Sequence, residues 1–273
     1  MIGVAGLRSG EEHRASRLGL TGRRIILGVG LGMLALALSP PLVALSRRYV
    51  AGEALQFSLL AFGVPMSFTV GAPWLTFRRS GHVEAAPGWA TRLARARSRK
   101  REPSRSVALV VVFCLVVVAW RLPQVVDAVA RHSLLAGLEA LTLVPVGVAL
   151  FLELLYSPPF EPRSSRPLRL GLAAVAMWLS WILAYMIGFA HVGWFDAYRH
   201  VPGDGLSLFA DQELTAGILW FVPFCCFVPI EAANLIGWLR GDDDPDAELR
   251  RLTSEDHRRA GADLIAEPNR LTD

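Results

Sequence analysis

The stretch "DQELTAGILWFVPFCCFVPIEAANLIGWLRGDDD" (211–244) is apolar over most of its length and polar at both ends. Asp211 and Gln212 precede the apolar run, and Glu231 lies near its end. A helix needs about 20 predominantly apolar residues to cross the hydrocarbon core of a bilayer. We therefore interpret residues 212–238 as a transmembrane helix.

Five further stretches of the chain have the same apolar character. The chain has 273 residues, of which 53% are hydrophobic, slightly more than the roughly 45–50% of soluble domains. A single soluble core would not need so many apolar blocks. The sequence therefore predicts an all-α, polytopic membrane protein with a bundle of about six transmembrane helices. The other five blocks are residues 25–45, 53–76, 106–120, 133–155 and 168–190, of which the third is short and draws on flanking residues.

Positive charge orients this bundle, because Lys and Arg near short loops favour the cytoplasmic side. Of the 28 Lys and Arg residues, 23 lie in the N-terminal segment, the second and fourth loops and the C-terminal tail, and 5 in the other loops. Both termini are thus predicted to be cytoplasmic. The predicted domains are a cytoplasmic tail (1–22), a membrane domain (23–240) with an Arg-rich loop (78–105), and a C-terminal tail (241–273) too polar to fold alone.

The Arg-rich loop is interpreted in two ways, as a basic amphipathic helix on the inner leaflet or as a solvated loop. The sequence pI of about 9.3 also raises binding to nucleic acid as an interpretation. The basic residues lie beside membrane segments, however, so contact with anionic lipid headgroups explains them more simply. We expect the lipid bilayer, and no nucleic acid, among the partners.

This topology places several polar side chains at one depth, in the outer third of the membrane. They come from three of the predicted helices and from residues 120–132, which are predicted to form a helix near the outer interface. We therefore predict a polar cluster on the outer side. Its candidate residues are Glu53, Gln56, Asp127, His132, Glu139, Asp211 and Gln212.

Glu139 is the most informative member, because an acid within the apolar slab is expensive and normally faces protein or water. It either binds a metal, a proton or a substrate, or it holds helices together as a structural residue that is protonated or paired with Arg121 or Arg131. Glu53 and Asp211 lie at predicted helix ends, where solvation by water is the simpler explanation. Asp211 also suits the first turn of its own helix as a cap.

Two further acids, Glu153 and Glu231, mark the predicted cytoplasmic ends of their helices, where we expect surface or snorkelling positions. Sulfur near the middle of the helices suggests a Cu(I) site, because thiolate and thioether ligands select that ion. Cys and Met are also ordinary core residues, and adjacent cysteines point to different faces of a helix. The weak metal candidates are Cys114, Cys225, Cys226, Met33 and Met66.

No Gly-rich phosphate loop, G-x-S-x-G elbow or HExxH motif occurs in the sequence, so we do not expect an enzyme. Several segments instead resemble the CtaG-type cytochrome c oxidase assembly factor family over residues 39–240. Four motifs appear in the family's order: Ser39-Pro40 followed by "EALQFSLLAFGVPMSFTVGAPW", "WRLPQVVDAVARHSLLAGLEA", Ser157-Pro158-Pro159, and "DQELTAGILW".

The resemblance implies copper as the metal of the family, with histidines as ligands. This chain departs from the pattern at the histidine positions. Phe and Ala cannot coordinate a metal, and Arg cannot be deprotonated to do so. The chain thus resembles a divergent member that lacks most of the family's histidines. The replacing residues are Glu53, Phe57, Arg121, Ala136 and Ala140.

The resemblance implies a role in biogenesis of cytochrome c oxidase, including maturation of its copper centre. The protein would act in the plasma membrane of a bacterium, through helix contacts with an oxidase subunit or another assembly factor. Two alternatives remain at this point. The protein is a structural accessory subunit of a respiratory complex, or a small transporter or proton path that uses Glu139.

Overall fold

The computed structural model describes residues 19–76, 88–98, 103–162, 164–199 and 205–240. Within these ranges the chain forms helices and their connections, without a β-strand. The elements are α2 (Leu20–Ala37), α3 (Pro40–Arg48), α4 (Val50–Ser58), the π-helical turn η1 (Leu59–Gly63), α5 (Val64–Gly71), α6 (Pro73–Thr76), α7 (Gly88–Ser98), α8 (Pro103–Trp120), α9 (Pro123–Arg131), α10 (Ser133–Leu154), α11 (Arg166–Gly188), the 3₁₀ turn η2 (Asp196–Tyr198) and α12 (Leu208–Leu239).

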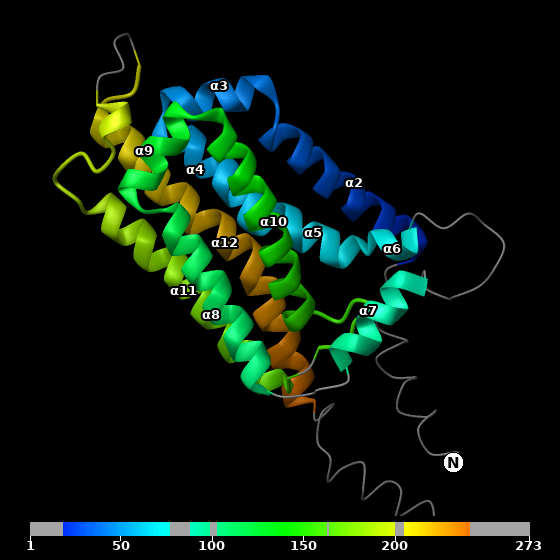
Figure 1. Cartoon of the computed structure of the whole chain (residues 1–273). Coiled ribbons are helices and arrows are strands. Elements are labelled where there is room, and N and C mark those ends of the chain that lie inside the picture. Colours follow the sequence, from blue (N-terminus) through cyan, green and yellow to red (C-terminus); the bar gives the residue numbers. More distant parts are fainter. Residues whose placement is uncertain (1–18, 77–87, 99–102, 163, 200–204, 241–273) are drawn as a thin grey trace, which may run out of the picture.

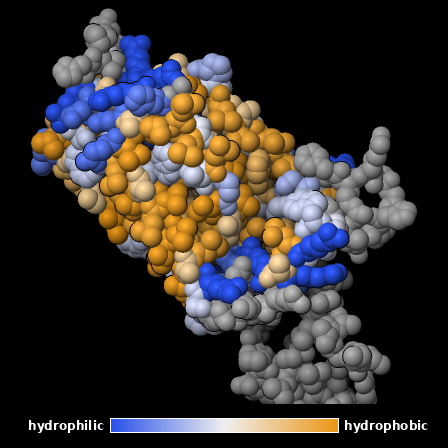
Figure 2. All heavy atoms as spheres, in the orientation of Figure 1, coloured by the Kyte–Doolittle hydropathy of each residue, from blue (hydrophilic) through white to orange (hydrophobic). Residues whose placement is uncertain are grey.

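The helices pack side by side as a bundle, with α3 and α9 at one end and α6 and α7 at the other (Figure 1). We call these the α9 end and the α7 end. Figure 2 shows a broad hydrophobic band between hydrophilic residues at the two ends. Among the described residues, four helical spans are long and apolar enough to cross a membrane, or up to six if each bent pair counts as one span. The prediction of an all-α polytopic membrane protein is confirmed. That the α7 end is cytoplasmic stays a prediction.

The first predicted span, residues 25–45, is bent rather than straight. α2 ends at Ala37 and α3 begins at Pro40, with an angle of 53° between them. Proline lacks a backbone N–H and disfavours helical geometry in the residue before it, and Ser39 is extended, with φ −71° and ψ 143°. The Ser39 hydroxyl accepts a hydrogen bond from the Leu42 backbone N at 3.4 Å and so caps α3.

A second bend separates α8 from α9. Leu122 is extended, with φ −62° and ψ 134°, and Pro123 begins α9, so the same proline effect operates. The two helices meet at 63°. Residues 120–132 therefore contain the separate helix that was predicted for them. Arg121 lies in the break between the two helices.

The span from α4 through η1 to α5 is the centre of the bundle. The most apolar 18-residue window of this span is 72% buried inside the protein, whereas the corresponding windows of α10, α11 and α12 are 28–39% buried. Phe62, in η1, meets the rings of Phe57, Phe113 and Phe227 edge to face, at centroid distances of 6.4, 5.9 and 5.9 Å. Protein rather than lipid therefore surrounds the acid that this span carries, Glu53.

Two glycines permit close approaches between this central span and its neighbours. At Gly147 on α10, an added Cβ would lie 2.8 Å from the carbonyl oxygen of Ala61 and 2.6 Å from Cγ of Pro65. At Gly71, an added Cβ would lie 3.0 Å from Cα of Leu27 on α2. α10 and α2 thus pack against the central span at distances that leave almost no room for a side chain.

The described part of the Arg-rich segment 78–105 includes α7, which favours the helix over the solvated loop. Ala90 is fully buried in a small apolar cluster beneath this helix, so α7 is packed on the bundle. The rest of the segment lies outside the described residues, apart from the start of α8. So does the tail 241–273, and most of the tail 1–22.

Candidate functional site

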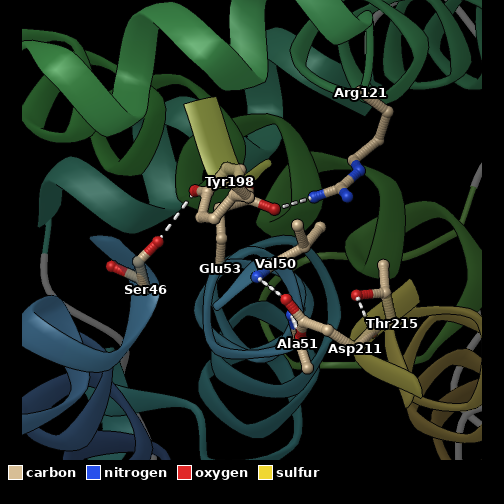
Figure 3. A network of polar contacts seen from close by, with 8 residues as sticks. All are labelled: Ser46, Val50, Ala51, Glu53, Arg121, Tyr198, Asp211 and Thr215. Atoms are coloured by element: carbon tan, nitrogen blue, oxygen red, sulfur yellow. Dashed lines mark hydrogen bonds and ion pairs between the residues drawn. The ribbon is translucent and has the colours of Figure 1, made fainter. Parts of the chain in front are cut away.

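A buried ion pair joins α4 to the break between α8 and α9. Nη1 of Arg121 donates to Oε2 of Glu53, and Figure 3 shows the two side chains pointing toward each other. Glu53 is 2% exposed and Arg121 3%. Buried charges normally have a partner of opposite sign, and here each residue supplies it to the other. The prediction that water solvates Glu53 is wrong, because protein covers this end of α4.

Two aromatic rings complete the surroundings of the guanidinium. Its central carbon lies 5.0 Å from the ring centroid of Phe57 and 6.0 Å from that of Phe195. A cation within about 6 Å of an aromatic face is attracted by the ring quadrupole, and more strongly when water is excluded. Phe57 and Phe195 are both fully buried. Arg121 is therefore held by an acid and by aromatic faces at once.

Glu139 on α10 is the second acid of this region. It is 2% exposed, and the charged groups that act on it are Glu53 and Arg121. Its Oε1 atom has no hydrogen-bond partner among the described residues. Arg131, the other predicted partner, is exposed. Arg121 thus has two acids nearby and donates a hydrogen bond to only one of them, Glu53.

We call Glu53, Phe57, Arg121 and Glu139 the Arg121 cluster. Besides Oε1 of Glu139, three of its polar atoms lack a hydrogen-bond partner in the described part of the chain: Oε1 of Glu53, and Nε and Nη2 of Arg121. Unpaired buried polar atoms are rare and destabilising. Their concentration in one place distinguishes this cluster from an ordinary structural ion pair.

Tyr198, in η2, covers the cluster from the connection that precedes α12. Its hydroxyl donates to the carbonyl oxygen of Ser46 at 2.8 Å (Figure 3). Burial raises the pKa of the Tyr198 hydroxyl well above its usual range, and the negative charge of Glu53 raises it further. Tyr198 is therefore a neutral donor beside the charged pair.

Asp211 caps a helix other than its own. Its carboxylate accepts hydrogen bonds from the backbone N–H groups of Val50 at 2.8 Å and Ala51 at 2.9 Å, the first residues of α4. α12 begins before Asp211 and is capped by Ser207. Asp211 is 4% exposed. Both predictions for it, solvation by water and capping of its own helix, are wrong, because the start of α12 packs on the start of α4.

The two glutamines of the predicted cluster satisfy backbone carbonyls at helix ends. Nε2 of Gln56 donates to the carbonyl oxygen of Ala37, the last residue of α2, at 2.8 Å. Nε2 of Gln212 donates to the carbonyl oxygens of Ile187 at 2.7 Å and Ala190 at 3.2 Å. The last carbonyls of a helix have no partner within it, so both glutamines stabilise helix ends.

Asp127 and His132 complete the predicted set. Asp127 accepts hydrogen bonds from the backbone N–H groups of Asp196 at 3.2 Å and Ala197 at 3.0 Å, and so ties α9 to η2. His132 is exposed at the start of α10. Of the seven predicted residues, two acids meet around Arg121, four bind backbone groups, and the histidine stays outside.

A family model matches residues 3–241, nearly the whole chain. It is the model of the cytochrome c oxidase caa3 assembly factor (Caa3_CtaG). The protein belongs to this family. No curated protein and no solved structure matches the chain. The resemblance that the motifs indicated is therefore confirmed. The prediction of a multi-pass membrane protein that belongs to a family of oxidase assembly factors is confirmed as well.

Residues that this Caa3_CtaG member shares with the family pattern mostly build the scaffold. The Ser157 hydroxyl donates to the carbonyl oxygen of Thr69, on α5, at 2.7 Å. Nε1 of Trp120 donates to Oγ1 of Thr142 at 2.9 Å and so joins α8 to α10. Asp211, Gln56 and Gln212 also belong to the scaffold, because each of them hydrogen-bonds to backbone groups at the end of a helix. The motif pattern thus indicates the fold more directly than it indicates a reaction.

The residues present do not fit a copper ion at the Arg121 cluster. The cluster offers two carboxyl groups, which suit Cu(I) poorly, and a guanidinium, which has no lone pair to give. Phe57, and Ala136 and Ala140 beside Glu139, supply no donor atom. Among the described residues, no group of three or more His, Cys, Asp or Glu side chains is arranged to hold a metal.

The predicted sulfur ligands lie on four different helices. Met33 on α2, Met66 on α5 and Cys114 on α8 are half-buried. Cys226 on α12 is buried, whereas Cys225 is exposed, and all three cysteines are free thiols. The adjacent cysteines thus face different sides of the helix, as predicted.

A further buried acid, Glu153, lies at the α7 end. Oε1 of Glu153 on α10 accepts from Nη2 of Arg97 at 2.5 Å, and Oε2 accepts from the Ser106 hydroxyl at 3.0 Å. Glu153 is fully buried, so its predicted surface position is wrong, because α7 and α8 cover it. We call these three residues the Glu153 cluster. Sequence reasoning missed it, since no local pattern links residues so far apart in the chain.

Proposed function

We propose that this protein assists the biogenesis of a cytochrome oxidase in the bacterial plasma membrane. It would do so by docking, within the bilayer, against an oxidase subunit or another assembly factor. The observation that carries the proposal is the family match over residues 3–241, which includes every described helix. Membership in a family of oxidase assembly factors implies interaction with oxidase components, and the apolar surface of the bundle implies that contacts form inside the membrane.

One surface is well suited to such a contact. Trp178 and Trp181 on α11 and Trp220 and Phe224 on α12 form a continuous series of rings, which we call the aromatic ladder. Trp181 and Trp220 stack at a centroid distance of 5.3 Å, and Trp220 and Phe224 at 5.4 Å. Trp178 is 54% exposed and Trp220 37%. The ladder thus presents large, rigid rings on the outside of the bundle.

The position of the ladder along the helices supports a protein partner. All four rings lie near the middle of α11 or α12, whereas Trp and Tyr facing lipid are enriched at the membrane interfaces. Aromatic residues, Trp above all, are enriched among the residues that dominate protein–protein binding. A transmembrane helix of an oxidase subunit, packed along α11 and α12, would bury the ladder.

A second candidate function, a proton path, is favoured by the buried Oε1 atom of Glu139 that lacks a hydrogen bond in the described part of the chain. An acid within a membrane domain is a common element of proton relays. Replacement by Gln removes the titratable carboxyl group, so the side chain can no longer take up and release a proton. If Glu139 carries protons, Glu139→Gln abolishes proton flux in proteoliposomes but leaves oxidase assembly intact.

The docking proposal is tested by deleting the gene and measuring oxidase activity with and without added copper. We expect reduced activity in both conditions, restored by the unaltered gene. Normal activity in both would overturn the proposal. Restoration by copper alone would indicate maturation of the copper centre rather than docking.

A matched pair of variants tests the surface. Trp178→Ala with Trp220→Ala removes two rungs of the ladder, and we expect it to lower oxidase recovery. Tyr185→Ala with Phe189→Ala removes a second exposed aromatic pair, stacked at 5.9 Å near the end of α11, and serves as the control.

An accessory subunit, in contrast to an assembly factor, would co-purify with the mature oxidase in equal amounts.

A further inference from the structure

Three positions at which the family pattern has histidine contact one another in this chain. Glu53 and Arg121 form the buried ion pair, and the guanidinium of Arg121 lies over the ring of Phe57. Glu53 and Arg121 are 68 residues apart in the sequence, so folding alone brings them together. The replaced positions therefore converge on one place in the molecule.

The other two replaced positions belong to the same place. Ala136 and Ala140 flank Glu139 on α10, and residues three and four apart lie on one face of a helix. Glu139 interacts electrostatically with Glu53 and Arg121, and Ala140 packs against the buried core. Glu53 and Phe57 thus contact the guanidinium of Arg121, and Ala136 and Ala140 lie next to Glu139 on α10.

The surroundings of the guanidinium are those of a bound cation. An acid on α4 supplies negative charge to it, a second acid lies on α10, and the face of Phe57 supplies the negative side of its quadrupole. Water has almost no access, since Glu53, Arg121 and Glu139 are each 2–3% exposed. The cation itself is covalently part of the chain and stays charged at any physiological pH.

We propose that the Arg121 guanidinium acts as an internal cation. It occupies a place that would be a metal site if histidines stood at the same five positions. In this chain the positive charge that joins α4 to the α8–α9 break is therefore permanent and not exchangeable. The protein would contribute to oxidase assembly without loading a metal here. This inference rests on family membership and the geometry of the cluster, and not on the docking surface.

The first test is a metal titration of the full-length protein in detergent. Cu(I) and Zn(II) are titrated separately, in competition with a chromophoric chelator, in a background of Cys114→Ser, Cys225→Ser and Cys226→Ser that removes binding by thiols. We expect no stoichiometric binding by this chain. The same background with five restored histidines should bind one equivalent and melt at a higher temperature when metal is present. The five changes are Glu53→His, Phe57→His, Arg121→His, Ala136→His and Ala140→His.

One equivalent of metal bound by the chain without the histidines, and lost in Glu53→Gln, would overturn the inference. So would a folded five-histidine variant that binds no metal.

The second test does not depend on the folding of that variant. Arg121→Ala removes the internal cation, and guanidinium ion at millimolar concentration is then offered in its place. We expect guanidinium to raise the melting temperature of Arg121→Ala but not that of the unaltered protein. Urea, which has a similar planar shape and no charge, should have no such effect. Recovery of folded Arg121→Ala only when guanidinium is present would support the inference equally.

Equal responses of the two proteins to guanidinium, or equal rescue by urea, would show that Arg121 does not act as a cation in a site. Arg97→Ala is the control for an arginine that pairs with a buried acid elsewhere in the bundle. A response of Arg97→Ala as large as that of Arg121→Ala would show that the effect of guanidinium is not specific to the Arg121 cluster.

Discussion

α10 carries one buried acid near each of its ends, about 21 Å apart by the rise of the helix, and their surroundings differ. Glu153, at the α7 end, accepts hydrogen bonds on both oxygens, from Arg97 and Ser106. Glu139, near the α9 end, has an oxygen without a hydrogen bond in the described part of the chain, although Arg121 lies nearby.

The difference separates a structural joint from a candidate site. In the Glu153 cluster an arginine and a hydroxyl donate hydrogen bonds to the two oxygens of the acid, and these contacts hold α7 and α8 on the bundle. In the Arg121 cluster two acids share one arginine, and four buried polar atoms have no hydrogen-bond partner among the described residues. Unpaired polar atoms lower stability, so their persistence favours a role beyond holding helices together.

The largest effect is expected at Arg121. Arg121→Ala leaves Glu53 and Glu139 buried without a cation, and breaking a buried pair in this way costs about 3–5 kcal/mol. The free energy of unfolding in detergent, measured with a denaturing surfactant, would show the loss. Arg121→Lys keeps the charge and should lose less. If Arg121→Ala were no less stable than Arg131→Ala, at an exposed position, the comparison of the two clusters would fail.

A smaller loss is expected at Glu153. Glu153→Gln removes the charge that Arg97 faces, and loss of a hydrogen bond to a charged group costs about 1.5–3 kcal/mol. The Arg97 side chain is 12% exposed, so water can partly replace the acid. We expect faster proteolysis within α7, because its contact with α10 is weakened. Glu213→Gln, at an exposed acid on α12, is the control, and an equal rate of cleavage in both variants would contradict the prediction.

Asp211 tests the helix that carries Glu53. Asp211→Ala removes the cap of α4, and such a loss typically costs about 1 kcal/mol, up to about 2. Hydrogen exchange at the amides of Val50 and Ala51 should become faster. Asp211→Asn keeps an acceptor oxygen and should lose less. Unchanged exchange at both amides in the alanine variant would show that the cap does not hold this helix end.

The smallest effect is expected at Tyr198. Tyr198→Phe removes the hydrogen bond to the Ser46 carbonyl, worth about 1 kcal/mol. Burial raises the pKa of Tyr198 in the folded protein above its unfolded value of about 10. The proton is thus bound more tightly in the folded state, and its contribution to stability is present below about pH 10 and is lost as the pH rises further.

The melting temperature of the unaltered protein should therefore fall more steeply above about pH 10 than that of Tyr198→Phe. Parallel curves for the two proteins would contradict a buried, neutral Tyr198. Titration of the tyrosine absorbance provides a second measurement, in which one tyrosine of the four in the chain should ionise only at higher pH in the folded protein.

The apolar blocks predicted the helical spans well, because hydrophobicity and length are local properties that a bilayer selects for. The bend at Ser39 was not predicted, although Pro40 carries a local signal for it. The helix over residues 120–132 was predicted from its proline and period. α7 was one of two open alternatives, since an Arg-rich segment suits both a helix and a loop.

For the site, the sequence identified Glu139 as a buried acid and Arg121 as a potential partner. It did not indicate that Arg121 pairs with Glu53 or that Phe57 lies against the guanidinium. It also placed Glu53, Asp211 and Glu153 in water, because each lies near a predicted helix end. A helix end is solvated only if no other segment covers it, and that depends on the packing of the whole bundle. The absence of enzyme activity stays a prediction, and the copper that the family resemblance implies stays untested.

The sequence by itself determined that this is an all-α membrane protein of the Caa3_CtaG family, since apolar runs and ordered motifs are read along the chain. Only the tertiary structure decided which acid Arg121 pairs with and which helix Asp211 caps. The reason is physical. These contacts join residues from 68 to 161 positions apart, and their geometry follows from how the helices bend and pack.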